Sequence, residues 1–252
     1  MPTVICFRPN FDAVTAYTHV WIGKIADYAR KRGYEVIDLE KADATLRNLV
    51  DALQNPYVVA VFIGTHGRDN LVVGDLEEPI LTACENDSVL TGKISYYGSC
   101  LAGRKLAPST FDKGGTTVVG YTGEFIFHFD PSYTPEDDPI AKPFGDAFVA
   151  PVLAILDGLA PSGVFDRTME AYDKAYAEIS RGWKPEDAMM LTALEGNRLG
   201  LVIYGETGKL QVPPARWLVY LLLAGAAIAV GLAIYKRRER KRWPKVAYAP
   251  EK

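Results

Sequence analysis

The sequence predicts an α/β layer fold with a mostly parallel sheet, followed by one transmembrane helix. Segments typical of strands and of amphipathic helices alternate through the first half of the chain. Residues 57–63, YVVAVFI, are almost continuously apolar, which is typical of a strand buried on both faces of a parallel sheet. Residues 217–235 carry no charge. Of the 252 residues, 48% are apolar and 23% are charged, which excludes intrinsic disorder for most of the chain.

The first half of the chain predicts five strands with two helices among them. Apolar residues spaced three or four apart predict a helix over residues 14–28 that ends at Gly33, and a second over residues 46–53 that stops before Pro56. The expected strands are short apolar runs at residues 3–7, 36–39, 57–63, 94–97 and 116–121.

The second half is richer in helices. Residues 130–143 hold four prolines and four carboxylates, so we expect a surface loop there. Three helices follow, over residues 144–156, over 165–179, and from Pro185 to Gly200; Pro151 should break or kink the first. A last strand is expected at residues 201–204, which closes a single domain of residues 1–204.

The C-terminal segment is interpreted as a membrane anchor. Residues 205–216 form a linker, and residues 217–235 follow as 19 uncharged residues, which as a helix would span roughly 28 Å at about 1.5 Å each. That length matches the hydrocarbon core of a bilayer, about 30 Å thick. Trp217, Tyr220 and Tyr235 lie near the ends of this segment, where aromatic rings favour the membrane interface. We therefore expect a single-pass membrane protein with the lipid bilayer as a partner.

The charge is distributed unevenly along the chain. The tail of residues 236–252 holds eight Lys or Arg and two Glu, whereas the preceding residues hold 20 basic and 29 acidic ones. An acidic body with a basic tail next to a membrane segment argues against nucleic acid as a partner. The positive-inside rule places this tail in the cytoplasm and the domain outside. The first residues show no export signal, however, and we favour a cytosolic domain.

Two strand ends carry side chains suited to catalysis. Residues 57–63 lead into Gly64-Thr65-His66-Gly67, and residues 94–97 lead into Gly98-Ser99-Cys100. If these strands are neighbours, His66 and Cys100 emerge at the same edge of the sheet. A thiol with a pKa of about 8.5 needs a base to be a strong nucleophile near neutral pH, and an imidazole supplies one. The backbone N–H groups of Gly67 and Cys100 could form an oxyanion hole.

This arrangement resembles the caspase-like cysteine peptidases, the clan that includes legumains, gingipains, clostripains, metacaspases and separases. The resemblance covers roughly residues 1–210. It rests on residues 58–63 before His66-Gly67, on residues 94–97 before Ser99-Cys100, and on the strand at residues 117–123. Residues 201–206 are similar to a late segment of the gingipain branch, although Thr207 replaces its usual proline. The resemblance implies a three-layer αβα sandwich and a cysteine endopeptidase that acts on proteins or peptides through a Cys100–His66 dyad.

The other cysteines and histidines are weaker candidates. Cys6 lies inside the first strand and Cys84 in a polar stretch, so both are expected to be inert. His19, on the first helix, is expected to be structural, and His128 is an alternative base. A zinc site is disfavoured because no CxxC or HxxxH spacing occurs, and no cofactor is expected.

The substrate pocket is expected beside the strand at residues 117–123. The following loop is acidic, with carboxylates at Glu124, Asp130, Glu136, Asp137 and Asp138. We expect Glu124 and Asp130 to wall the pocket and to favour Arg or Lys before the scissile bond, and the other three to be solvated. Solvation of the whole loop and Ca²⁺ binding are the alternatives. A preference for acidic substrates would instead require Arg68 or Arg104.

Three functions are compatible with the sequence. The first is a membrane-anchored cysteine endopeptidase, and the second is a catalytically silent caspase-like scaffold or sensor tethered to the membrane. The third is an unrelated α/β ligand-binding domain, which would place His66 and Cys100 far apart.

Overall fold

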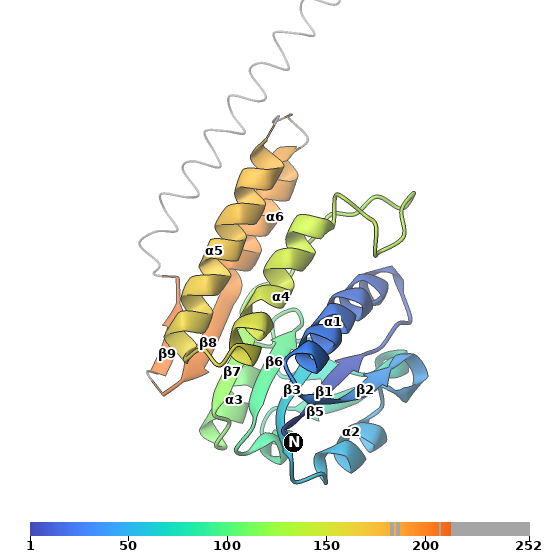
Figure 1. Cartoon of the computed structure of the whole chain (residues 1–252), viewed down its shortest axis with the longest axis vertical. Coiled ribbons are helices and arrows are strands. Elements are labelled where there is room, and N and C mark those ends of the chain that lie inside the picture. Colours follow the sequence, from blue (N-terminus) through green and yellow to red (C-terminus); the bar gives the residue numbers. More distant parts are fainter. Residues whose placement is uncertain (182–183, 185–186, 207, 213–252) are drawn as a thin grey trace, which may run out of the picture.

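The computed structural model describes residues 1–181, 184, 187–206 and 208–212, which form a layered α/β domain (Figure 1). Its central sheet has seven strands in the order β2-β1-β3-β6-β7-β8-β9. The parallel strands are β1 (Thr3–Arg8), β2 (Glu35–Glu40), β3 (Val58–Gly64), β6 (Ile94–Gly98) and β7 (Thr117–Tyr121). The remaining two, β8 (Leu201–Gly205) and β9 (Gly208–Gln211), are antiparallel. The prediction of an α/β fold with a mostly parallel sheet is confirmed.

Helices cover both faces of this sheet. The longer ones are α1 (Ala13–Lys31), α4 (Lys142–Leu156), α5 (Pro161–Ser180) and α6 (Asp187–Gly200), and they share one hydrophobic core. The shorter ones, α2 (Leu46–Leu53) and α3 (Leu106–Asp112), share a second core with a small β-hairpin. Tyr96 and Tyr97, neighbours on β6, belong to different cores because alternate side chains of a strand point to opposite faces.

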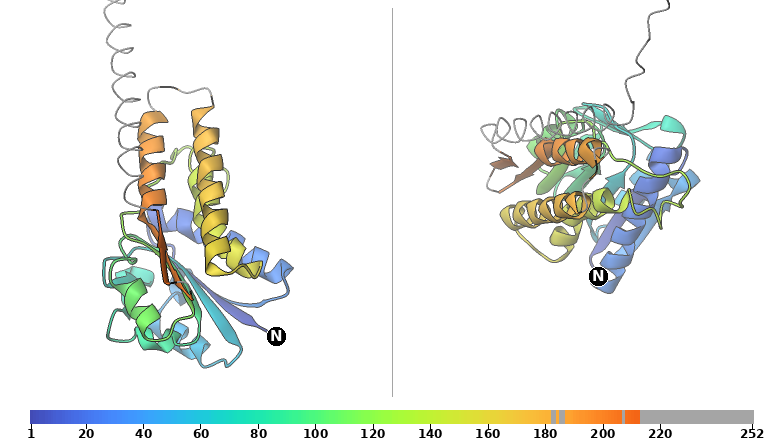
Figure 2. Two further views of the ribbon diagram at one scale, coloured as in Figure 1. Left: turned by 90° about the vertical axis from the view of Figure 1, so that its left-hand side faces the viewer. Right: turned by 90° about the horizontal axis from the view of Figure 1, so that it is seen from above.

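The helix pair α5 and α6 projects beyond the sheet, as Figure 2 shows. Helix α6 leads directly into β8, whose first residue, Leu201, pairs with Tyr121 at the carboxyl end of β7. The pair therefore rises from the same edge of the sheet as the segments that follow β3 and β6.

The structure corrects several of the predicted boundaries. Helix α4 continues through Pro151 instead of breaking there. The stretch expected to be a linker, residues 205–216, contains β9, which pairs with β8, and its last described residue, Val212, is buried. The polar sequence of β9 did not indicate a strand, because an edge strand needs apolar residues on one face only.

One helix and three strands were absent from the predictions. They are α3, β9 and the hairpin of β4 (Leu71–Val73) and β5 (Pro79–Thr82). Short 3₁₀ turns lie at η1 (Lys41–Asp43), η2 (Asp75–Glu77) and η3 (Asp87–Leu90).

The predicted membrane segment, residues 217–235, and the basic tail, residues 236–252, lie outside the described residues. Within the described ranges, no helix combines the length and the apolar character needed to cross a bilayer.

Candidate active site

The register of the sheet places His66 and Cys100 at the same edge, just past the ends of two neighbouring strands. Strands β3 and β6 are parallel neighbours in which Gly64 pairs with Gly98, and each functional residue follows its glycine by two positions. A Cβ atom at Gly67 would lie 2.9 Å from the Cβ of Ser99 and 3.0 Å from the carbonyl oxygen of Cys100. Residue 67 is therefore a position where only glycine allows the two segments to touch. Gly67 thus packs directly against Ser99 and the backbone of Cys100 at the carboxyl edge of the sheet.

Asp12 is the partner of His66, and sequence reasoning missed it. The Nε2 atom of His66 lies 2.6 Å from Oδ2 of Asp12, and both side chains are more than one-third exposed. Asp12 is also the N-cap of α1, where its Oδ1 accepts a hydrogen bond of 2.7 Å from the N–H of Thr15. Burial raises the pKa of Asp12, but the hydrogen bonds from Thr15 and His66 outweigh it, so the pKa is lowered overall.

The tautomer of His66 follows from this contact. An ionised carboxylate only accepts hydrogen bonds, so Nε2 of His66 carries the proton. The second ring nitrogen, Nδ1, is then the basic one, and it is available to exchange a proton with a substrate or with the thiol.

The thiol of Cys100 contacts the segment that follows β7. The N–H of Phe125 donates to Sγ over 3.4 Å, and the thiol lies 3.9 Å from the carbonyl oxygen of the same residue. Burial raises the pKa of Cys100, and the charge of Glu124 raises it further, whereas the N–H of Phe125 opposes them. The resting thiol is thus protonated, which makes a nearby base necessary for nucleophilic chemistry.

The segment of residues 122–126 is held across the thiol by α6. Asn197, which is buried, accepts a hydrogen bond of 2.9 Å from the N–H of Ile126 and donates one of 2.7 Å to its carbonyl oxygen. At the other end, the N–H of Thr122 donates to the carbonyl oxygen of Gly200 over 2.7 Å. Two anchors on one helix therefore fix the backbone that supplies the N–H to Cys100.

The two carboxylates expected in the substrate pocket differ in their surroundings. Glu124 is exposed and acts electrostatically on Cys100. Asp130 instead uses Oδ1 to accept hydrogen bonds of 2.9 Å from the N–H and 2.7 Å from the hydroxyl of Ser132, which lower its pKa. Of these two carboxylates, Glu124 is therefore the one whose charge acts on the thiol.

Asp138, predicted to be solvated, is buried. It accepts hydrogen bonds of 2.7 Å from the hydroxyl of Tyr17 and 2.8 Å from each N–H of Asp130 and Ile140. These donors replace water as partners of the carboxylate, which is what permits its burial. Asp138 anchors the acidic loop to α1.

A pocket of about 390 Å³ lies beside His66. The β4–β5 hairpin forms its outer wall, and Gly67 is joined to the hairpin by a bridge with Val72. The pocket is lined by His66, Gly67, Arg68, Leu71, Val73, Glu77 and Pro79.

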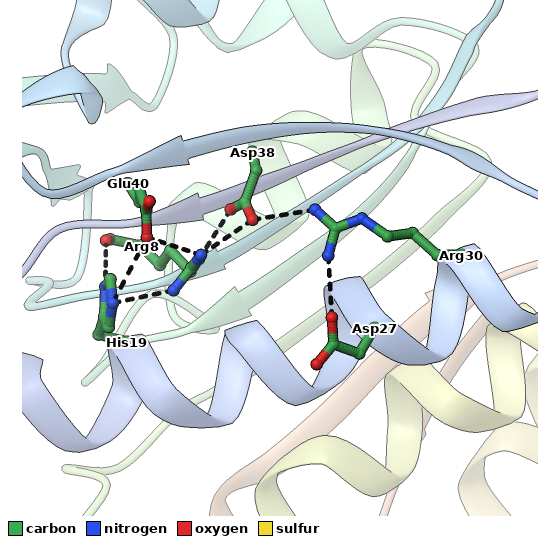
Figure 3. Close-up of polar contacts among 6 residues, drawn as sticks. All are labelled: Arg8, His19, Asp27, Arg30, Asp38 and Glu40. Carbon is green, nitrogen blue, oxygen red and sulfur yellow. Dashed lines mark hydrogen bonds and ion pairs between the residues drawn. The ribbon is translucent and has the colours of Figure 1, made fainter.

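His19 takes part in a charge network at the β2 edge of the sheet (Figure 3). Its Nδ1 lies 2.9 Å from the carbonyl oxygen of Arg8 and its Nε2 lies 2.8 Å from the guanidinium of the same residue. Arg8 also binds Asp38 and Glu40, each at 2.7 Å. This network fixes the end of β1 and the start of α1, between which Asp12 lies. It agrees with a structural role for His19.

The remaining candidates lie apart from this arrangement. Cys6 is fully buried, and burial raises its pKa strongly. Cys84 is exposed beside Ser109, and His128 packs with its ring 6.1 Å from that of Phe144. In the part of the chain that the structure describes, no cluster of three or more His, Cys, Asp or Glu side chains could hold a metal ion.

Two solved structures are similar to this chain. Gingipain R (RGPB), described as an Arg-specific cysteine proteinase, matches 75% of this chain and 44% of its own, with 14% identity and a TM-score of 0.48. A chain in the complex of Porphyromonas gingivalis RgpB pro- and mature domains matches 77% of this chain and 45% of its own, with 12% identity and a TM-score of 0.50. The fold is caspase-like. This chain spans less than half the length of either match. No protein-family model matches the sequence, and no curated protein matches it.

Proposed function

We propose that this protein is a cysteine endopeptidase in which Cys100 is the nucleophile and His66 is the general base and acid. The observation that carries the proposal is the β3–β6 register, which puts His66 and Cys100 at one sheet edge and packs Gly67 against Ser99 and Cys100. The contact of 2.6 Å between His66 and Asp12 supports it further, because a carboxylate orients an imidazole and stabilises its protonated form.

The reaction proceeds in two stages. His66 takes the proton of the Cys100 thiol, and the sulfur attacks the carbonyl carbon of the scissile bond to give a tetrahedral intermediate. The C–N bond then breaks as His66 returns the proton to the leaving nitrogen, which leaves a thioester on Cys100. A water molecule, deprotonated by His66, attacks this thioester, and the acid product and the free thiol are released.

The oxyanion of the intermediate is assigned to the N–H groups of Gly67 and Cys100. Gly67 touches Cys100 and has no side chain to block the approach of a substrate. Two backbone donors on adjacent strand ends are fixed by the sheet, so they need no reorganisation during the reaction.

Substrates with a basic residue before the scissile bond fit the charges of the site. Glu124 is exposed, and its charge acts on Cys100 by raising the pKa of the thiol. An unpaired carboxylate there attracts an Arg or Lys side chain. Asp130, engaged with Ser132, makes the smaller contribution.

Anchoring to a lipid bilayer through residues 217–235 is part of the proposal. Its support is the sequence, since 19 uncharged residues are followed at once by a dense basic run. We propose a single-pass membrane protein with a cytosolic domain.

A catalytically silent scaffold is the second candidate, and the raised pKa of Cys100 favours it. A peptide library that varies the residue before the scissile bond separates the two, using the wild type and Cys100→Ala. We expect cleavage after Arg or Lys by the wild type and none by the variant. Cleavage at equal rates by both proteins would exclude Cys100 as the nucleophile, and no cleavage by either would favour the scaffold.

A further inference from the structure

We propose that the pocket beside His66 binds the side chain of the residue that follows the scissile bond, and that it favours an apolar residue there. This inference rests on the proposed peptidase function. It adds a second specificity site, on the leaving-group side of the thiol, to the basic preference on the other side.

The position of the pocket follows from the path of the proton. His66 must come within about 3 Å of the leaving nitrogen to protonate it. The residue that carries this nitrogen therefore lies on the His66 side of Cys100. Because His66 and Gly67 line the pocket, the pocket lies on that same side and is within reach of the side chain of that residue.

The wall of the pocket is tied to the catalytic segment by the backbone. The N–H of Val73 donates to the carbonyl oxygen of His66 over 3.2 Å, and the N–H of Arg68 donates to that of Leu71 over 2.8 Å. The hairpin thus keeps a fixed distance from His66. A side chain bound against it would help to position the scissile bond.

The lining of the pocket determines which side chain it favours. Leu71, Val73 and Pro79 contribute apolar side chains to a lining that also contains the His66 ring, and Arg68 and Glu77 contribute one charge of each sign. A charged substrate residue would meet one attractive and one repulsive group and would lose water. An apolar residue gains by leaving water, so it is the favoured occupant.

The tip of the hairpin is also unusual. Leu76 and Glu77 both have left-handed backbone conformations, with φ of 55° and 62°, and Leu76 is 83% exposed. Two consecutive residues of this kind are costly, and such conformations concentrate at binding sites. They place an exposed apolar side chain next to Glu77, which lines the pocket.

The test uses internally quenched peptides with Arg before the scissile bond and Leu, Ala, Lys or Glu after it. An Arg coumarylamide, which has no amino acid after the bond, reports the dyad separately. We expect kcat/KM for the Leu peptide to exceed that for the Glu peptide by about 10-fold or more.

A negative charge introduced into the wall of the pocket should reverse the order of kcat/KM among the peptides. Leu71 is half-buried, so Leu71→Glu introduces a carboxylate at the pocket without emptying the core. We expect this variant to favour the Lys peptide over the Leu peptide, and Leu71→Ala to reduce the preference for Leu without reversing it. The matched control is Val89→Glu, because Val89 is 39% exposed and precedes β6 at the opposite edge of the sheet. It should keep the wild-type ranking.

The two proposals fail in different ways. Equal kcat/KM for all four peptides, with the coumarylamide hydrolysed, would overturn the pocket assignment and leave the peptidase function standing. Unchanged ranking in Leu71→Glu would overturn the assignment too. A folded protein that hydrolyses neither the peptides nor the coumarylamide would overturn both.

Discussion

His19 and His66 lie near the carboxyl ends of parallel strands, and each contacts a carboxylate, yet their surroundings differ. His19 uses both ring nitrogens on Arg8, inside a network closed by Asp38 and Glu40. His66 uses Nε2 on Asp12, and its ring lines an open pocket. A histidine held at both nitrogens stabilises structure, whereas one held at a single nitrogen can transfer a proton. The following changes test this difference, from the largest expected effect to the smallest.

Removal of either member of the dyad should have the largest effect. We expect Cys100→Ala and His66→Ala each to reduce kcat/KM by about 10³-fold or more, since neither group works without the other. The measurement is hydrolysis of an Arg coumarylamide. His19→Ala and Cys84→Ser are the controls, and each should keep activity within about threefold per folded molecule. A similar loss in His19→Ala would erase the distinction between the two histidines.

Asp12→Asn should come next, with a fall in kcat of about 10²-fold. Asparagine caps a helix as well as aspartate does, so α1 stays intact while the charge that stabilises protonated His66 is lost. Steady-state kinetics and the thermal midpoint separate the two roles of Asp12. A large loss of stability with a normal kcat would show that Asp12 acts only as a helix cap and does not assist His66.

Glu124→Gln should lower kcat/KM for Arg substrates by about 10- to 100-fold and spare neutral ones, because it removes the charge that pairs with the substrate. It should also lower the pKa of Cys100, since the charge of Glu124 raises it. The pH dependence of Cys100 alkylation by iodoacetamide measures this shift. Asp130→Asn is the matched control, and the reverse order of the two effects would move the pocket towards Asp130.

Asn197→Ser should act in the opposite direction on the same thiol. Loss of the two hydrogen bonds to Ile126 loosens Phe125, whose N–H stabilises the thiolate. The pKa of Cys100 then rises, and the alkylation curve moves to higher pH. Thr192→Ala, on the exposed face of the same helix, should leave the curve in place. An unshifted curve in Asn197→Ser would show that α6 does not position the thiol.

The smallest effect on activity is expected in the closed network. Burial raises the pKa of Asp38, but hydrogen bonds from Arg8 and Arg30 lower it overall. Its charge therefore stabilises the fold above the unfolded pKa of about 3.9, and this contribution disappears as the pH falls through the lowered value. We expect Asp38→Asn to cost about 1–3 kcal/mol in urea unfolding at pH 7 and less near pH 2. If the free energies of unfolding of the wild type and Asp38→Asn differed by the same amount at pH 7 and near pH 2, the lowered pKa of Asp38 would be contradicted.

The sequence was sufficient to predict the position of a candidate catalytic residue where that residue directly follows an apolar strand. Residues 58–63 and 94–97 are such strands, so the positions of His66 and Cys100 at one sheet edge could be expected. The hairpin that walls the pocket could not, because its strands have three and four residues and enclose a charged turn. Such short runs resemble loops when taken alone.

Contacts between residues far apart in the sequence could not be predicted either. Asp12 lies 54 positions before His66 in the sequence. Its role as the N-cap of α1 accounts for an aspartate at this position, so the sequence gives no reason to expect a contact with a histidine. Asp138 lies in a loop rich in carboxylates and prolines, and its carboxylate accepts hydrogen bonds from four donors, of which the hydroxyl of Tyr17 is 121 positions away in the sequence. Asn197 is one polar residue on a predicted helix. Asp12 does follow β1, a neighbour of β3, and this was the available signal.

The direction of β9 has a practical consequence. Because β8 and β9 are antiparallel, Gln211 pairs with Val202 and the described chain ends at Val212, beside the edge that holds Cys100. Near the N-terminus, Thr3 begins β1 at the opposite edge. Immobilisation of a chain truncated after Val212, through its new C-terminus, would therefore turn the reactive edge towards the support and hinder large substrates more than small ones. Attachment through the N-terminus would leave that edge facing the solution.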